Sequence, residues 1–137
     1  MKKIFSTKYS DNYISFALLL LRIAFGGLMI HHGYQKLTGF ASGAAGFSDP
    51  FHIGGPASMA LVIFAEFFCA VLLVLGLMTR LACIPLIITM AVAFYKAHNG
   101  VIYGKSGGEM ALIYLLGYLA LLFTGPGKIS LDRLIGK

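Results

Sequence analysis

Four long apolar segments limit what this chain can fold into. A helix needs about 20 mainly apolar residues to cross the hydrocarbon core of a bilayer. Segments of roughly this kind run over Tyr13–Tyr34, Ala57–Met78, Leu81–His98 and Glu109–Thr124. They lack the alternation of polar and apolar residues that the strands of a membrane barrel need. The sequence therefore predicts an all-α integral membrane protein, a four-transmembrane-helix bundle in which residues 1–137 form a single domain.

The composition supports a bilayer as the partner and argues against nucleic acid. Of the 137 residues, 58% are hydrophobic and 12% are charged, whereas soluble domains carry about 25% charged residues. The net charge is +6, but the basic residues flank the apolar segments and form no stripe interleaved with aromatic side chains. We therefore expect contacts with lipid headgroups and no binding of nucleic acid.

The basic residues also predict the orientation of the bundle, because cytoplasmic loops carry an excess of Lys and Arg. With both termini in the cytoplasm, the outer side holds only Lys36, Lys96 and Lys105. The inner side then holds Lys2, Lys3, Lys8, Arg80, Lys128, Arg133 and Lys137. We expect a multi-pass protein of a bacterial-type cytoplasmic (inner) membrane with both termini inside.

Two connecting segments carry more apolar side chains than a flexible tether would. The loop Gln35–Gly55 contains Phe40, Phe47, Phe51 and Ile53, so we expect it to fold back onto the outer mouth of the bundle. The tail Ile129–Lys137 is amphipathic. It predicts a short C-terminal interfacial helix along the inner surface.

Two charged residues, Arg22 and Glu66, interrupt the first two apolar segments. Charged residues inside a membrane usually face the bundle interior, meet a partner and mark a functional site. At about 1.5 Å of rise per residue, both lie roughly 13–17 Å below the outer ends of their predicted helices. We predict that they form an ion pair near mid-membrane. The alternative to a functional pair is a structural bridge that fixes the helix register.

Further titratable residues lie near the outer ends of the predicted helices: His32, Lys36, Lys96, His98 and Glu109. Together they predict a polar funnel with the Arg22–Glu66 pair at its floor. The substrate-binding candidates are His32, Lys36, Glu66 and His98, and the catalytic candidates are Arg22, Glu66 and His32. The alternatives are a histidine bonded to a carbonyl, lysines that reach the membrane interface, and a Glu109 that stabilises a helix N-terminus. No histidine spacing is typical of a metal site, so we expect no metal.

Small residues within the spans predict close packing. Cys69 and Cys83 would differ in depth by roughly 9 Å, too far for a disulfide, and we interpret them as small core residues. Three glycines of the first segment, Gly26, Gly27 and Gly33, are expected to allow close contact between helices.

Three stretches of the sequence resemble the DoxX family of small four-helix membrane proteins. Arg22–Phe40 reads R-x9-H-G-Y-Q-K-L-x-G-F, and Leu75–Arg80 reads L-G-L-M-T-R after Glu66. The end of the chain, Gly125–Asp132, reads G-P-G-K-I-S-L-D. The match covers nearly the whole chain, and it is specific in the order and spacing of the motifs. By position, the motif residues are Arg22, His32, Gly33, Lys36, Glu66, Arg80 and His98.

The resemblance implies a redox context. The family is commonly labelled as oxidoreductases, and its relatives are described as a thiosulfate:quinone oxidoreductase subunit, as proteins of catechol or quinone stress, and as a partner of thiol and superoxide enzymes. We therefore expect a redox-associated protein that handles a quinone or related phenolic near the outer leaflet. An oxidoreductase subunit and a quinone cofactor rest on the resemblance alone. Two alternatives stay open: a non-catalytic scaffold for redox enzymes, and a small proton or anion transporter working as a homo-oligomer.

Overall fold

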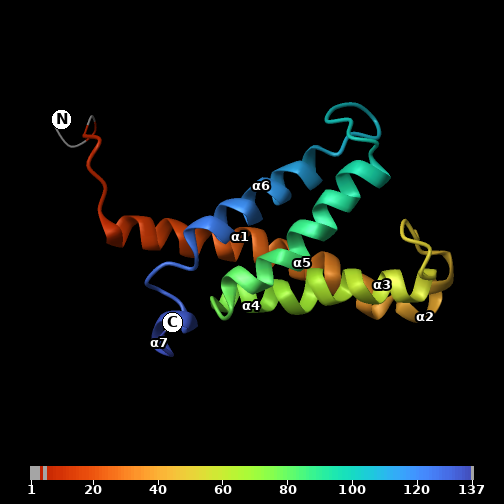
Figure 1. The fold of residues 1–137 in the computed structure, drawn as a ribbon, viewed down its shortest axis with the longest axis horizontal. Coiled ribbons are helices and arrows are strands. Elements are labelled where there is room, and N and C mark those ends of the chain that lie inside the picture. Colours follow the sequence, from red (N-terminus) through yellow and green to blue (C-terminus); the bar gives the residue numbers. More distant parts are fainter. Residues whose placement is uncertain (1–3, 5, 137) are drawn as a thin grey trace.

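A computed structural model describes residue 4 and residues 6–136, and within these residues it is helical with no strand (Figure 1). Three helices are long and apolar enough to cross a membrane: Asp11–Thr38, Gly55–Leu75 and Thr79–Ala97. The last long helix, α6 (Glu109–Thr124), is apolar but has only 16 residues. The expected membrane helical bundle is therefore confirmed, whereas its fourth crossing stays a prediction.

The observed helices begin and end close to the predicted positions, with one consequential exception. α1 (Asp11–Thr38) continues four residues past its predicted end at Tyr34. Helix two is continuous over α3 (Gly55–Ile63), η2 (Phe64–Cys69) and α4 (Ala70–Leu75). Helix three is continuous over α5 (Thr79–Val92) and η3 (Ala93–Ala97). Both η2 and η3 are π-helical, a conformation that is rare and frequently found at functional sites.

The helices form two antiparallel pairs, α1 with helix two and α5 with α6, and the pairs diverge toward one end (Figure 1). Two glycines allow the close contact between α1 and helix two in the first pair. A Cβ on Gly33 would lie 2.5 Å from the backbone nitrogen of Phe67, and one on Gly26 would lie 2.6 Å from Val74 Cγ2. The predicted close contact is thus confirmed for these two glycines, whereas a Cβ on Gly27 would meet nothing within 4 Å.

The core lies where the two pairs meet. Its most deeply buried members include Leu73, Leu86, Tyr118 and Leu121, each 0% exposed. The Tyr118 hydroxyl donates to the carbonyl of Phe25 at 3.1 Å, which satisfies its polar group inside the core. Both cysteines are buried in this cluster as free thiols, which confirms their interpretation as core residues.

The two ends of the bundle differ. The end that we call the terminal end carries the start of α1, the tight turn between α4 and α5, and α7 (Leu131–Leu134) (Figure 1). The turn needs left-handed backbone at Gly76 (φ 68°) and Met78 (φ 50°). The opposite end, the loop end, carries α2 (Phe40–Gly43), η1 (Ala44–Gly46) and the segment joining η3 to α6.

The connecting segments follow the predictions in part. Ala44 packs with Met59 and Ile63, and Phe47 is half-buried against them, so the loop does fold back onto helix two. The C-terminal helix is shorter than predicted, with four residues. This helix buries a polar side chain and exposes an apolar one, because Asp132 is 7% exposed and Leu134 is 80% exposed. Of the basic residues assigned to the inner side, Lys2, Lys3 and Lys137 lie outside the described residues.

Candidate functional site

Arg22 and Glu66 do not pair, so the predicted ion pair is wrong. Glu66 is bonded to Lys36. The Arg22 guanidinium donates instead to carbonyls at the terminal end of the bundle. It reaches Leu73 O at 3.1 Å, Val74 O at 3.0 Å, and both Pro126 O and Ile129 O at 2.7 Å.

The ion pair was predicted wrongly because the position of α1 along helix two differs from the expected one. The prediction aligned Gly33 with the start of helix two, but α1 runs on to Thr38 and Gly33 lies directly against Glu66. One helical turn is 3.6 residues, so Lys36 follows Gly33 on the same face and meets Glu66. Arg22, eleven residues before Gly33, is carried to the other end of the bundle.

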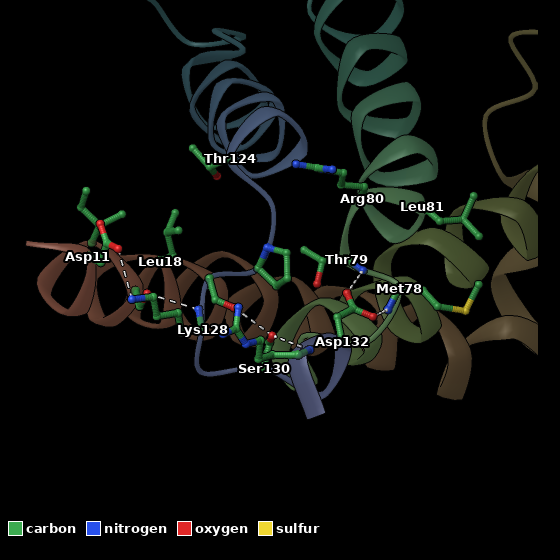
Figure 2. Close-up of a pocket in the computed structure, with 15 residues that line it drawn as sticks. Asp11, Leu18, Met78, Thr79, Arg80, Leu81, Thr124, Lys128, Ser130 and Asp132 are labelled. Carbon is green, nitrogen blue, oxygen red and sulfur yellow. Dashed lines mark hydrogen bonds and ion pairs between the residues drawn. The ribbon is translucent and has the colours of Figure 1, made fainter. Parts of the chain in front are cut away.

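Arg22 caps helix two rather than lining a binding site. The last carbonyls of a helix have no partner within the helix and carry the negative end of its dipole. Arg22, at 1% exposure, donates to Val74 O and adds a second donor to Leu73 O, which also accepts from the Gly76 backbone, and it holds the segment from Pro126 to Ile129. Asp132 acts in the same region, since its carboxylate accepts from the backbone of Met78 at 2.7 Å and of Thr79 at 3.0 Å (Figure 2). We call Arg22, Asp132 and these backbone partners the terminal latch.

The charged residues at the loop end surround a cavity of about 290 Å³ between helices two and three. We call it the loop cavity. Lys36, Glu66 and Lys96 supply its charge, and Ser48, Ser58 and Thr89 supply hydroxyl groups. Its other lining residues are Phe47, Pro50, Phe51, Ile53, Leu61, Val62, Ile88, Val92, Ala93 and Ala97. A mainly apolar pocket with a few convergent polar groups is the usual form of a small-molecule site.

Two of the three charges come from π-helical segments. Glu66 lies in η2, and Lys96 lies in η3 on the facing helix. A π turn inserts an extra residue into a helix and re-aims the side chains around it. Glu66 is only 5% exposed, and its partner Lys36 neutralises it at the cavity wall. Because Lys36 and Glu66 neutralise each other, Lys96 gives the charged residues of the loop cavity a net positive charge.

A fixed segment of the loop covers the cavity. The Asp49 carboxylate accepts from the backbone of Ile53 at 2.9 Å and of Gly54 at 2.7 Å, and from the Ser58 hydroxyl at 2.9 Å. Burial acts to raise the pKa of Asp49, but the hydrogen bonds from Gly54, Ile53 and Ser58 outweigh it and lower the pKa. Asp49 thereby joins the loop that carries Phe51 to the first turn of α3.

The other predicted site residues lie apart from this cavity. His32 is exposed on α1 and does not line it. The His98 ring shares a hydrogen bond with the carbonyl of Ser106, 2.7 Å from Nδ1, and Glu109 lies in the first turn of α6. The funnel is thus divided: Lys36, Glu66 and Lys96 come together, whereas His32, His98 and Glu109 do not line the cavity. Sequence reasoning overlooked the hydroxyl of Thr89 and the two π segments, for which no sequence pattern was available.

The fold and this site define a small helical membrane protein with charged groups placed inside its spans. The DoxX family model matches residues 17–99. The chain belongs to the DoxX family.

Curated relatives are similar in sequence to this chain over most of their length. A Haemophilus influenzae protein described as uncharacterized is 32% identical over 131 residues, covering 90% of this chain and 93% of its own. Uncharacterized membrane protein Rv3486 of Mycobacterium tuberculosis is 31% identical over 136 residues, covering 88% and 82%. Inner membrane protein YphA of Escherichia coli is 33% identical over 126 residues, covering 85% and 88%. No solved structure matches significantly. These relatives support a bilayer environment and a bacterial inner membrane.

Proposed function

We propose that the loop cavity binds the head group of a quinone or related phenolic, and that the protein acts as a redox-associated component of the membrane. The observation that carries the proposal is a partly buried ion pair, Lys36–Glu66, facing a mainly apolar cavity that Lys96 also lines. The ammonium groups can donate to the ring oxygens. The Glu66 carboxylate can accept the hydroxyl proton of a phenol or quinol.

The size and walls of the cavity suit such a ligand. Its volume of about 290 Å³ lies at the lower end of ligand pockets, which suits a head group of one or two rings. Two lining side chains, Leu61 and Ile88, are 60% and 55% exposed. In a bilayer these would face lipid, so an apolar tail could extend from the cavity between the acyl chains.

The proposal assigns the chain a role in binding and proton exchange. Reduction of a quinone to a quinol takes up two electrons and two protons. We assign the electrons to a partner redox enzyme and the proton contacts to Glu66 and Lys96. His32 and His98, the other binding candidates from the sequence, are left without a head-group contact because neither lines the cavity.

Binding can be measured directly on the purified protein in detergent. The chain has seven tyrosines and no tryptophan, so quenching of tyrosine fluorescence can follow titration with a short-chain benzoquinone and its quinol. We expect saturable binding that Glu66→Gln and Lys96→Gln weaken about tenfold, because a hydrogen bond to a charged group contributes about 1.5–3 kcal/mol. Lys96 is exposed, so its variant keeps the fold if Glu66→Gln does not.

Two control variants sharpen the result. Lys105→Gln removes an exposed charge at the same end without touching the cavity, and His32→Ala removes the candidate that the sequence favoured. Both are expected to bind like the wild type. Unsaturable binding, or equal affinity of the wild type and Lys96→Gln, rules the proposal out.

The proposal includes four membrane crossings with both termini in the cytoplasm. Support comes from the terminal end, where Arg80, Lys128 and Arg133 line one cavity and Lys8 precedes the start of α1. The 16 residues of α6 span about 24 Å, and local thinning of the bilayer accommodates such a mismatch at modest cost. A fluorescent protein fused to the C-terminus should fluoresce, and alkaline phosphatase fused there should be inactive. An active phosphatase fusion at this position overturns the orientation.

A further inference from the structure

A second and larger cavity, of about 570 Å³, lies at the terminal end. Figure 2 shows it between the start of α1, the turn before α5 and the segment that follows α6. We call it the terminal groove. Two of the family motif stretches, Leu75–Arg80 and Gly125–Asp132, contribute to its lining, but the proposed function assigns it no role.

Three basic side chains from three different segments line the groove. Arg80 comes from the first turn of α5, Lys128 from the segment after α6, and Arg133 from α7. All three are exposed. The Arg80 guanidinium is oriented by the carbonyls of Leu122 at 3.2 Å and Phe123 at 3.5 Å. The lining residues therefore present exposed positive charge at the ends of the helices.

The two carboxylates in the groove have structural partners. Asp11 pairs with Lys128, 3.2 Å apart, and Asp132 caps α5 through the backbone of Met78 and Thr79 (Figure 2). Three basic and two acidic side chains leave a net positive lining. At the groove floor, the Thr79 hydroxyl is buried and has no hydrogen-bond partner within the part of the chain described.

Apolar side chains lie beside these charges. Ile14 and Leu18 of α1 line the groove, and Leu81 of α5, which is 56% exposed, lines it on the opposite side from Leu18 (Figure 2). A groove with basic groups at the helix ends and apolar side chains beside them has the polarity of a phospholipid, with phosphate at one end and acyl chains at the other. Basic pockets between membrane helices on the cytoplasmic side bind anionic head groups.

We propose that the terminal groove is a binding site for an anionic phospholipid, with the phosphate held by Arg80 and Arg133 and an acyl chain against Ile14 and Leu18 of α1. The terminal latch makes the site rigid, because Arg22 fixes the segment that carries Lys128. The site is independent of the loop cavity, so either one can fail without the other.

Native mass spectrometry of the delipidated full chain tests this. The probes are phosphatidylglycerol and phosphatidylcholine with the same acyl chains. We expect preferential retention of phosphatidylglycerol, and about a fivefold loss of that preference in Arg133→Gln, since each basic residue near an anionic surface contributes about that factor. Within the described residues the Arg133 side chain makes no hydrogen bond that holds the fold, so this variant should fold even if Arg80→Gln does not.

The control is Lys105→Gln, which removes the same charge at the opposite end and should keep the preference. A competition with inorganic phosphate separates the two sources of a phosphate group. Millimolar phosphate should leave the lipid bound, because it lacks the acyl contacts. Displacement by free phosphate, equal retention of the two lipids, or an equal effect of the Arg133 and Lys105 variants would each overturn the proposal.

Discussion

A single arginine holds three segments together at the terminal end of the bundle. Arg22 is buried among apolar residues, where an unpaired charge would be very costly, but its guanidinium reaches four carbonyl oxygens. A guanidinium presents five N–H donors in a fixed fork, so it can serve helix two and the segment after α6 at once. A lysine has one nitrogen and could not span both.

Replacing this arginine should therefore destabilise the whole protein. In Arg22→Met the side chain is similar in length but donates nothing, and several buried carbonyls lose their partner. We expect the free energy of unfolding in detergent to fall by about 2–4 kcal/mol, measured by denaturant titration. Leu20→Met, a change on the exposed side of the same helix, should cost under 0.5 kcal/mol. An equal effect of the two changes would mean that the latch contributes nothing.

Asp49 gives the loop over the cavity a pH dependence in acid. Its pKa is lowered in the folded protein, so its contribution to stability is present above the ordinary aspartate range and is lost as pH falls through the lowered value. We expect the backbone amides of Ile53 and Gly54, which donate to the Asp49 carboxylate, to stay protected from hydrogen exchange from pH 7 to pH 5 and to lose protection in stronger acid. Asp49→Asn should remove the acid transition. Protection that stays constant down to pH 2 in the wild type would contradict this role.

At the scale of the helices, close approach of α1 and helix two sets the register that brings Lys36 to Glu66. Gly33 has no room for a side chain against the backbone of Phe67, whereas Gly27 faces open space. Gly33→Ala should therefore force the helices apart and cost about 1–3 kcal/mol, with loss of the Lys36–Glu66 contact. Gly27→Ala is the matched control, expected to be neutral or slightly stabilising. Unfolding titrations of the two variants decide the matter, and equal stabilities would refute the close contact.

The two π segments lead to a deletion experiment. A π turn holds one residue more than an α-helix needs, so deleting Phe68, which is 51% exposed, lets η2 relax to α-helix with the rest of helix two in register. We expect a folded protein in which Glu66 is re-aimed and quinol binding falls about tenfold. Deleting Ile88 from the regular helix α5 rotates everything after it by about 100° and should prevent folding. Wild-type quinol affinity after the Phe68 deletion would show that the π turn does not position Glu66.

Across the whole molecule, the sequence predicted the elements better than their alignment. The apolar runs predicted the long helices, and most of the observed helix ends lie close to the predicted ones. The alignment depended on where α1 ends, and the helix runs through Gly33, beside its predicted end at Tyr34, and ends only at Thr38, before Gly39. Gly33 lies against Glu66 and not against the predicted start of helix two at Ala57, a difference of nine residues (66 − 57), or about 13.5 Å of helix, and this realignment replaced Arg22 by Lys36 as the partner of Glu66. The π segments were not predictable because a local extra residue leaves no periodic pattern.

The two cavities lie at opposite ends, and the packed core separates them. Leu86, Tyr118 and Leu121 are each 0% exposed, belong to the core cluster and line neither cavity, so we expect a monomer to present an apolar barrier to a proton or anion. We expect vesicles containing the protein to lose an imposed pH gradient no faster than protein-free vesicles, as followed by an entrapped pH-sensitive dye. Leu86→Ala, which opens space in the core, should leave that rate unchanged because an apolar cavity stays dry. Flux that the wild type supports and Glu66→Gln abolishes would instead favour transport, and would require a path through an oligomer.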